Sequence, residues 1–378
     1  MSKKIFFWAP LLGHVGTINA VIYSAVSLNK YAKAEVYIID TFGQLDSFSS
    51  DYPNLKFIKI FKFGKFLPKT GLASKFCIYF FSIISAPILV NLIRGHTPDI
   101  LITNLVGVVP LILRPFFKKN CKIINSIQGY PKLNVLRKFL WKNLYKKSDL
   151  IITMSNLSRE YIINKINIKP SKIVKIDNPV ITKKIRLLAR EKISSKLDDQ
   201  IQNNFCITLV GRLTRQKNYI SFLNTLLRLN KEFSNLLVLI IGEGELRIEI
   251  ESFLKDNNIQ NVKLLGFKSN PYKYISKSKL FISSSLWEDP GHALIEASYL
   301  NTPILTSDCL SGPREIYKDG LNAFVYESNN ENEMFDKLKR ILQNYQSTKS
   351  ILLPSKKITK NYTFFNFFKS LNKHVDLR

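Results

Sequence analysis

Two glutamates stand on either side of a glycine turn in the segment SLWEDPGHALIEA, residues 285–297. Glu288 and Glu296 are separated by seven residues, and an apolar run at 280–283 precedes them. A strand, a loop and a helix in this order would put both carboxylates above the carboxyl edge of a parallel sheet, where such folds bind ligands. Backbone N–H groups at the start of the helix would face a polar ligand. They belong to Gly291, His292 and Ala293. Two carboxylates suit a ligand with many hydroxyls, although two solvated helix acids explain the spacing equally well.

A second set of candidate residues is cationic and follows the apolar run FCITLV, residues 205–210. Gly211 comes next, and Arg212 and Lys217 are two of the three cations that precede a helical pattern. The glycine allows close backbone approach, and the cations can hold a diphosphate and stabilise the negative charge that it gains on leaving. A basic loop without a ligand is the alternative. The next predicted strand ends in another glycine turn, formed by Gly242 and Gly244.

The elements that must position these residues follow from hydrophobic periodicity. Short apolar runs alternate with helical patterns along the chain, which predicts repeated βα units and parallel sheets. We expect strands at 5–9, 35–40, 56–60, 100–104, 122–126, 150–153, 205–210, 236–242, 262–265, 280–283, 303–306 and 323–326. Two blocks of six strands predict two doubly wound α/β domains, at 1–182 and 183–355. We expect the aromatic segment 356–378 to form a helix that packs back on the first domain.

Over residues 205–330 the chain resembles the retaining GT-B glycosyltransferases of family 4. The resemblance rests on five motifs in the family's order: VGRLTRQKN, IIGEGE, VKLLGF, the two glutamates described above, and TPILTSDCLSGPREIYKDGLNAFVYE. It implies a GT-B fold, in which two Rossmann-like domains face each other across a cleft. It also implies a hexosyltransferase-type enzyme whose nucleotide-sugar donor, a UDP- or GDP-sugar, is held mainly by the second domain.

The same resemblance assigns roles to individual residues. Arg212 and Lys217 match the pair that clamps the donor diphosphate in the family. Glu296 matches the glutamate that holds the nucleotide ribose, and Glu288 matches the one that faces the donor sugar. Backbone groups after the VKLL strand meet the nucleotide base in the family, and here they belong to Gly266, Phe267 and Lys268.

The first domain matches the family less closely. The loop APLLGHVG, residues 9–16, lies where the family has a glycine-rich loop near the donor and the acceptor. Its candidate residues are Gly13, Gly16 and His14. Many relatives carry a histidine near the reacting sugar, and this chain has Gln128 at that place. The loop after Glu288 also departs from the family, because it reads Asp-Pro-Gly where a glycine–aromatic pair is common. The preferred donor sugar therefore stays open.

The sequence contains no Asp-x-Asp motif and no cluster of His, Cys and Asp with metal-ligand spacing, so we expect neither a metal nor another cofactor. Protein cations and helix N-termini must then meet the phosphate charge. By resemblance, a donor phosphate oxygen accepts the acceptor's proton, and the sugar keeps its anomeric configuration. The four cysteines form no CxxC pair, which fits reduced thiols in the cytosol.

The net charge of +28 is concentrated in the first half of the chain. Residues 1–182 contain 26 basic and 8 acidic residues, whereas 183–378 contain 30 and 20. Asp99 is the one acidic residue between Asp51 and Asp149. Such a surface attracts nucleic acid, anionic lipid or a phosphorylated substrate; a general drift toward lysine is the alternative explanation. No zinc-finger spacing, RRM signature or helix-turn-helix pattern is present, so we expect no nucleic-acid partner.

Three segments of the first half favour a membrane surface. The run PKLNVLRKFLWKNLYKK, residues 131–147, places six cations among aromatic and aliphatic residues on a helical period, as in helices that lie on anionic membranes. An ordinary amphipathic helix with its apolar side in the core is the alternative. The run FIKIFKFGKF, residues 57–66, is similarly basic, and the uncharged stretch 76–93 favours a buried or interfacial helix over a transmembrane span.

These observations predict a cytoplasmic glycosyltransferase bound peripherally to the inner face of the plasma membrane. Its acceptor would be lipid-linked, or a cell-surface polysaccharide or lipopolysaccharide. A nucleotide-sugar epimerase of the same fold is one alternative function. A non-catalytic nucleic-acid-binding protein is the alternative of a different class.

Overall fold

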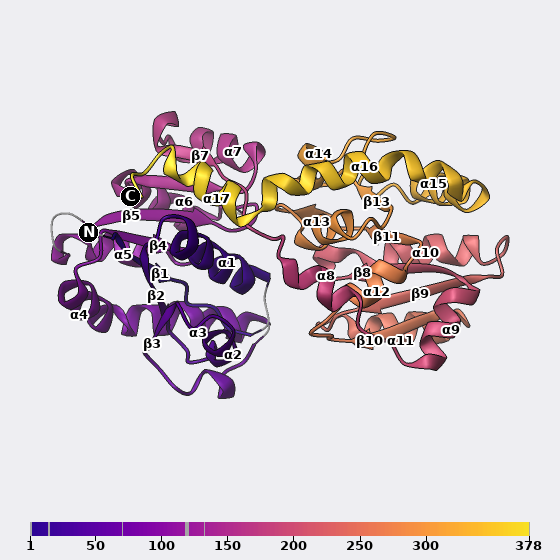
Figure 1. Ribbon diagram of the computed structural model, residues 1–378, viewed down its shortest axis with the longest axis horizontal. Helices are drawn as coiled ribbons and strands as arrows, with labels where there is room; N and C mark the ends of the chain where they lie inside the picture. Colours follow the sequence, from indigo (N-terminus) through magenta and orange to yellow (C-terminus); the bar gives the residue numbers. More distant parts are fainter. Residues whose placement is uncertain (1, 14–15, 70, 118–120, 132, 378) are drawn as a thin grey trace. The chain divides into compact units, whose positions relative to one another are not determined.

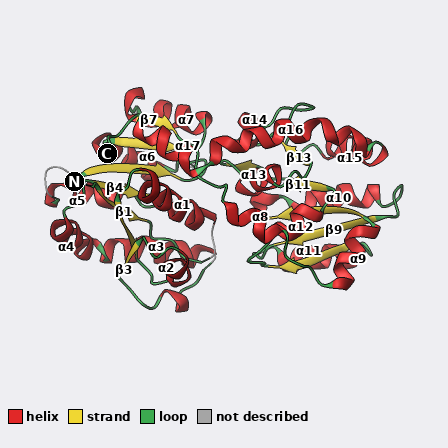
Figure 2. Ribbon diagram, viewed as in Figure 1, coloured by secondary structure: helices red, strands yellow, loops and turns green. Residues whose placement is uncertain are grey.

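The computed structural model describes residues 2–13, 16–69, 71–117, 121–131 and 133–377 (Figure 1). Its contacts divide the chain into two compact units, residues 1–180 together with 363–378, and residues 181–362. We call them unit 1 and unit 2. The chain thus passes between the units after residues 180 and 362, where the sequence analysis placed the boundaries after 182 and 355. Helices pack on both faces of the sheet in each unit (Figure 2).

Unit 1 contains a seven-stranded parallel sheet in the order β3-β2-β1-β4-β5-β6-β7. The strands are β1 (Lys4–Trp8), β2 (Glu35–Asp40), β3 (Lys56–Lys59), β4 (Ile100–Thr103), β5 (Lys122–Ile127), β6 (Leu150–Thr153) and β7 (Ile173–Lys175). Six of them lie where periodicity predicts a strand, within one residue at each end. The seventh, β7, was missed because three residues after a 3-10 turn are too few to show a period.

Strand β1 is buried on both faces, because its side chains alternate between two apolar cores. Ile5 and Phe7 pack with α1 (Gly16–Tyr31) on one face, and Phe6 and Trp8 pack with α4 (Ala86–His96) on the other. None of the four side chains has exposed surface. The beginning of the chain therefore reads as a continuous apolar run, as strands of a covered parallel sheet do.

The stretch 76–93 forms parts of two helices rather than one. It covers the end of α3 (Gly71–Ile84) and the beginning of α4, and the two helices are bent by 51° at their junction. Within the described ranges, no single helix is long and apolar enough to cross a membrane, although this bent pair passes the same test of length and composition. The other helices of unit 1 before residue 180 are α2 (Asp46–Asp51), α5 (Val108–Leu113), α6 (Val135–Leu144) and α7 (Asn156–Ile166).

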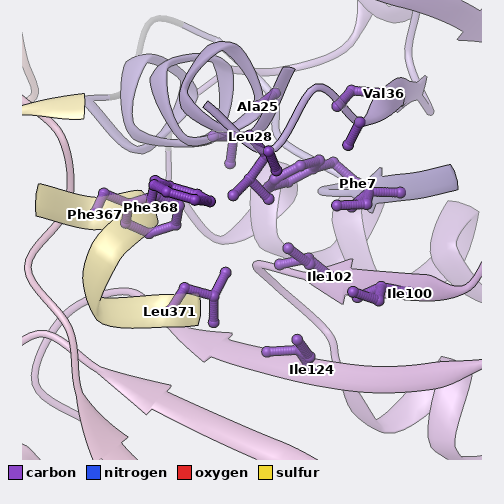
Figure 3. Packing of buried hydrophobic residues seen from close by; sticks show 14 of the residues in the cluster. Phe7, Ala25, Leu28, Val36, Ile100, Ile102, Ile124, Phe367, Phe368 and Leu371 are labelled. Carbon is purple, nitrogen blue, oxygen red and sulfur yellow. The ribbon is translucent and has the colours of Figure 1, made fainter. Parts of the chain in front are cut away.

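The last helix, α17 (Phe364–Asn372), packs against α1 and completes the core of unit 1. Phe367, Phe368 and Leu371 lie beside Ala25 and Leu28, over the strands of the sheet (Figure 3). This helix is a structural part of unit 1, although more than 180 residues separate it from the rest of that unit in the sequence.

Shortening Leu371 to alanine is expected to lower the free energy of unfolding of unit 1 by about 2–5 kcal/mol, because a fully buried leucine leaves a cavity. Urea unfolding followed by circular dichroism measures this loss. Phe365 lies on the same helix but is 50% exposed, so Phe365→Ala is the matched control with a smaller loss. Equal losses in the two variants would contradict the packing of α17 described above.

Unit 2 contains a six-stranded parallel sheet in the order β10-β9-β8-β11-β13-β15. These strands are β8 (Phe205–Val210), β9 (Leu236–Ile241), β10 (Val262–Gly266), β11 (Leu280–Ser283), β13 (Ile304–Ser307) and β15 (Phe324–Tyr326). The short strands β12 (Trp287–Glu288) and β14 (Leu310–Ser311) pair separately. The helices are α8 (Lys183–Ala189), α9 (Ser195–Asn203), α10 (Tyr219–Leu229), α11 (Arg247–Asp256), α12 (Tyr272–Lys277), α13 (His292–Tyr299), α14 (Gly312–Ile316), α15 (Glu331–Gln343) and α16 (Lys349–Ile358).

Candidate functional site

The two sets of residues singled out in the sequence meet at the switch point of the unit 2 sheet. Strands β8 and β11 are neighbours in the sheet but far apart in sequence. After β8 the chain continues to β9 on one side of this pair, and after β11 it continues to β13 on the other side. Loop 211–218 follows β8, and loop 284–291 follows β11. Because both strands are parallel, the two loops emerge at the same carboxyl edge, where open α/β sheets bind their ligands.

Hydrogen bonds fasten these two loops to each other. The Leu286 N–H donates to the Gln216 carbonyl at 2.8 Å, and the Gln216 amide donates to the Trp287 carbonyl at 2.8 Å. The Ser284 hydroxyl donates to the Lys217 carbonyl at 2.8 Å. The backbone that carries the cations is therefore held in register with the backbone that carries Glu288.

An ion pair links the two loops through their side chains. The Lys217 ammonium contacts Oε1 of Glu288, and the Ser285 hydroxyl donates to the same oxygen at 2.7 Å. The Glu288 side chain is 9% exposed and that of Lys217 is 21% exposed. Gly211 makes room for this arrangement, since a Cβ there would lie 2.7 Å from Cε of Lys217. A cation and a carboxylate that the sequence analysis assigned to different parts of a ligand thus neutralise each other.

Arg212 differs from Lys217 in having its charge available. Its side chain is exposed and makes no hydrogen bond or ion pair with the residues that the structure describes. It sits next to Gly211, at the same sheet edge as the Lys217–Glu288 pair. An anion at this edge would therefore meet one exposed guanidinium and one ammonium held by a carboxylate.

Glu296 lies on α13, five residues into the helix, and is mostly shielded from water. Burial raises the pKa of its carboxyl to about 7, and a hydrogen bond from the Tyr272 hydroxyl, at 3.1 Å, opposes that rise. Tyr272 is the first residue of α12. A carboxyl in this environment changes protonation near neutral pH, so small changes around it alter its capacity to accept hydrogen bonds.

His292 begins α13 beside the ion pair. Burial lowers the pKa of its imidazole to about 4; nearby Glu288 opposes this effect and Lys217 adds to it. The side chain is therefore neutral at physiological pH. Gly291 precedes it with φ of +91°, a conformation suited to glycine. The backbone N–H groups of His292 and Ala293 make no hydrogen bond to described residues, so both are available to a ligand.

The glycines that follow β9 and the glycine that ends β10 bring neighbouring turns close together. Gly242 donates its N–H to the Gly266 carbonyl at 2.9 Å, and a Cβ on Gly242 would lie 1.9 Å from the Gly211 carbonyl oxygen. A Cβ on Gly244 would lie 2.3 Å from the carbonyl oxygen of the loop residue Leu213. These glycines are needed for packing between loops at the sheet edge. Beyond them, the side chains of Phe267 and Lys268 are exposed after β10.

The candidates of unit 1 lie in that unit's own sheet edge. Gly13 follows β1 with φ of +74° and donates its N–H to the Gln44 side chain at 3.0 Å. Gly16 is exposed at the first position of α1, and His14 lies outside the described residues. Gln128 follows β5 and is fixed by hydrogen bonds to Ser126 and Asn178, at 2.8 and 2.7 Å. Its amide therefore has a set orientation.

Three side chains of the site escaped the sequence analysis: Ser285, Gln216 and Tyr272. Ser285 and Gln216 lie in the motifs already quoted, but a serine or glutamine in a loop is common and carries no signal of its own. Tyr272 reaches Glu296 from another helix, 24 residues earlier in the chain. Among the described residues, no three His, Cys, Asp or Glu side chains gather as a metal ion would require.

Comparison with known proteins gives a consistent picture. Residues 191–352 match the family described as glycosyl transferases group 1. An uncharacterised glycosyltransferase of Methanocaldococcus jannaschii is 31% identical over 250 residues, which cover 62% of this chain and 61% of that protein. The chain therefore spans somewhat less than two thirds of that relative.

A second relative is the N-acetylgalactosamine-N,N'-diacetylbacillosaminyl-diphospho-undecaprenol 4-alpha-N-acetylgalactosaminyltransferase of Campylobacter jejuni. It is 32% identical over 257 residues, covering 66% of this chain and 68% of that protein. Among solved structures, the Anabaena protein HepE in complex with UDP and glucose superimposes with a TM-score of 0.79 at 16% identity, covering 98% of both chains. Together with the two parallel α/β sheets, these matches show that the chain belongs to the group 1 glycosyltransferases and has the GT-B fold.

Proposed function

We propose that unit 2 binds a nucleotide-sugar, a UDP- or GDP-sugar, at the edge formed by loops 211–218 and 284–291. The observation that carries this proposal is the Lys217–Glu288 ion pair beside the exposed Arg212. The pair holds a cation in place without ligand, and the nearby arginine adds charge that described residues do not neutralise. Both charges lie where the N–H groups that begin α13 are available to an anion.

In this proposal, the donor diphosphate binds Arg212 and Lys217, and the ribose hydroxyls bind the Glu296 carboxylate. As the bond between the sugar C1 and the diphosphate oxygen breaks, the two cations stabilise the charge that develops on that oxygen. The acceptor hydroxyl bonds to C1 from the same face, and its proton passes to the leaving phosphate oxygen. The anomeric configuration is retained, and this chain's own cations take the role that a metal has in other transferases.

The acceptor proposed for this enzyme is a sugar carried on a polyprenyl diphosphate, at the inner face of the plasma membrane. The Campylobacter jejuni relative has such an acceptor in its name, and this chain has a basic first unit that would attract anionic lipid. A cell-surface polysaccharide or a lipopolysaccharide is the alternative acceptor.

The deciding experiment measures sugar transfer from UDP-sugars and GDP-sugars to an undecaprenyl-diphosphate-linked acceptor, with and without EDTA. We expect product in both conditions, with its new linkage in the donor's anomeric configuration by NMR. A melting screen with UDP and GDP identifies the base, because a ligand that binds the folded state raises its stability with the logarithm of concentration. A donor sugar altered without any acceptor would instead indicate an epimerase, and loss of product with EDTA would contradict metal independence.

The proposed role of Glu296 predicts that donor binding depends on pH. Its pKa of about 7 means that the carboxylate, which accepts ribose hydrogen bonds, is lost as the pH falls. We expect the affinity for a UDP-sugar to fall between about pH 8 and pH 6, and Glu296→Gln to bind weakly and without this pH dependence. Calorimetric titration measures both. Tyr272→Phe removes a bond that favours the carboxylate, and should move the midpoint to higher pH.

The control for this test is a donor analogue that lacks both ribose hydroxyls. Its affinity should be low and should show no dependence on pH in the wild-type protein. If the wild type keeps the same pH profile with that analogue, Glu296 does not bind the ribose.

A further inference from the structure

Helix α3 buries its two serines and exposes most of its large apolar side chains. Its two buried residues are Ser74 and Ser82. Its exposed large side chains are Leu72, Phe76, Tyr79, Phe80, Ile83 and Ile84. Leu72 is 82% exposed, Phe76 is 67% exposed and Ile83 is 65% exposed. Surface helices of globular proteins have the opposite arrangement, with their apolar stripe facing the core.

The packing of α3 explains how it tolerates buried serines. The Ser82 hydroxyl donates to the carbonyl of Ile78 on the same helix, so it does not need a partner elsewhere. The Phe81 ring contacts the rings of Phe42, Phe61 and Phe63, which lie near the ends of β2 and β3. Aromatic contacts thus hold one side of α3 against the rest of unit 1, and the opposite side is uncovered.

Helix α4, which follows after the 51° bend, cannot leave the protein together with α3. Leu89 and Ile93 have no exposed surface and belong to the core that contains Phe6 and Trp8. Helix α3 alone has 14 residues, or about 21 Å, which is shorter than the hydrocarbon core of about 30 Å. Helix α3 by itself is thus long enough to lie along a membrane surface and too short to cross the bilayer.

Helix α6 lies next to α3 and also exposes apolar side chains. Arg137 on α6 donates from Nη2 to the Tyr79 hydroxyl on α3 at 2.9 Å, so the two helices are adjacent. None of the residues of α6 is buried. Val135 is 88% exposed, and Leu136 and Phe139 are 65% and 64% exposed. We call the exposed apolar residues of α3, with these three of α6, the docking surface. Large exposed apolar side chains gathered on two adjacent helices indicate a site of interaction.

The charges around the docking surface indicate which kind of partner binds there. No aspartate or glutamate occurs from residue 52 to residue 98. Exposed lysines flank the apolar residues instead: Lys62, Lys65, Lys69, Lys75, Lys138 and Lys142. A second copy of the chain would bring the same positive charges against them. An anionic bilayer offers hydrocarbon to the apolar side chains and negative headgroups to the lysines.

We propose that α3 and the first turns of α6 insert the docking surface into the interfacial layer of an anionic bilayer and hold unit 1 on it. This inference rests on the proposed function only for its purpose, because an acceptor carried on a lipid would require unit 1 to be at a membrane. The attachment has two parts, hydrocarbon contact through the apolar side chains and attraction through the lysines. Salt therefore weakens it without abolishing it.

The test compares two double variants in binding to vesicles. Leu72→Ser with Ile83→Ser removes two apolar side chains from α3. Ile248→Ser with Leu353→Ser is the matched control, because those residues of unit 2 are 77% and 63% exposed. We expect the α3 variant to bind vesicles of phosphatidylcholine and phosphatidylglycerol at least about tenfold more weakly than wild type, and the control variant to bind like wild type. Because all four positions are exposed, both variants should melt at the wild-type temperature.

Each further outcome has a definite meaning. Equal vesicle binding by the α3 variant and the wild type overturns the proposal. If, in addition, the wild type forms a dimer that the α3 variant loses, a second copy of the chain is the occupant instead. Phe76→Trp gives an independent readout, since its fluorescence should be quenched by brominated lipid. Vesicle binding that depends on α3, without sugar transfer to any lipid-linked acceptor, would contradict the proposed function and leave the docking surface standing.

Discussion

Replacing Lys217 by alanine is expected to lower the rate of sugar transfer by about 100-fold or more. The reason is the loss of a cation that is held by Glu288 at the place where the leaving diphosphate gains charge. The same change should lower the free energy of unfolding by about 1–3 kcal/mol, because Glu288 is left nearly buried without its counter-ion. Initial rates at saturating donor measure the first effect, and urea unfolding measures the second.

Two further variants separate catalysis from stability. Lys217→Met combined with Glu288→Gln removes both charges, so it should recover much of the lost stability but none of the lost rate. Arg215→Ala is the matched control for the loss of a cation, since Arg215 is exposed in the same turn. If the double variant regained activity, Lys217 would serve the fold and have no part in the chemistry.

Arg212→Ala is expected to lower the rate of transfer to a similar extent, by about 100-fold, and also to weaken the binding of a nucleoside diphosphate. Its effect on stability should be close to zero, because the Arg212 side chain is exposed and has no partner among the described residues. The effect on stability distinguishes the two cations. Lys217 has a role in the fold as well as the proposed role in catalysis, whereas Arg212 has only the proposed role in catalysis.

The measurement for Arg212 is the pair of kcat and the Kd of the nucleoside diphosphate, with the melting temperature as control. Arg212→Lys should recover part of the rate, since it keeps the charge and loses the planar fork that binds phosphate at two points. A wild-type rate in Arg212→Ala would show that Lys217 and the N–H groups of α13 suffice for the diphosphate.

Most of the fold could be predicted from periodicity, because strands covered on both faces leave continuous apolar runs. The run at 205–210 is an example, with five of its six residues buried and its bounds predicted correctly. The glycosyltransferase family and the GT-B fold were predicted from five motifs and are confirmed by the comparisons. Strand β7 was not predictable, because its pairing with β6 depends on a neighbour and not on its own three residues.

The candidate site was predictable in its residues and not in their contacts. The sequence analysis placed Glu288 and Lys217 in one site, but it could not find that they pair with each other. That contact depends on the order of β8 and β11 in the sheet and on the space above Gly211. The roles of these residues toward the donor remain predictions. Helix α3 was expected to be buried or interfacial, and only its packing tells which side chains face outward.

The placement of α17 in unit 1 has a consequence for synthesis on the ribosome. Unit 2 is one uninterrupted stretch of chain, whereas unit 1 needs segments from both sides of it. At roughly 5–20 residues per second, translation of the intervening 181–362 takes roughly 10–40 s. During that interval the apolar face of α1 waits for the helix that will cover it. Unit 1 is therefore the first unit to begin folding and the last to be completed. Until α17 is synthesised, the apolar face of α1 is a surface that a chaperone could bind.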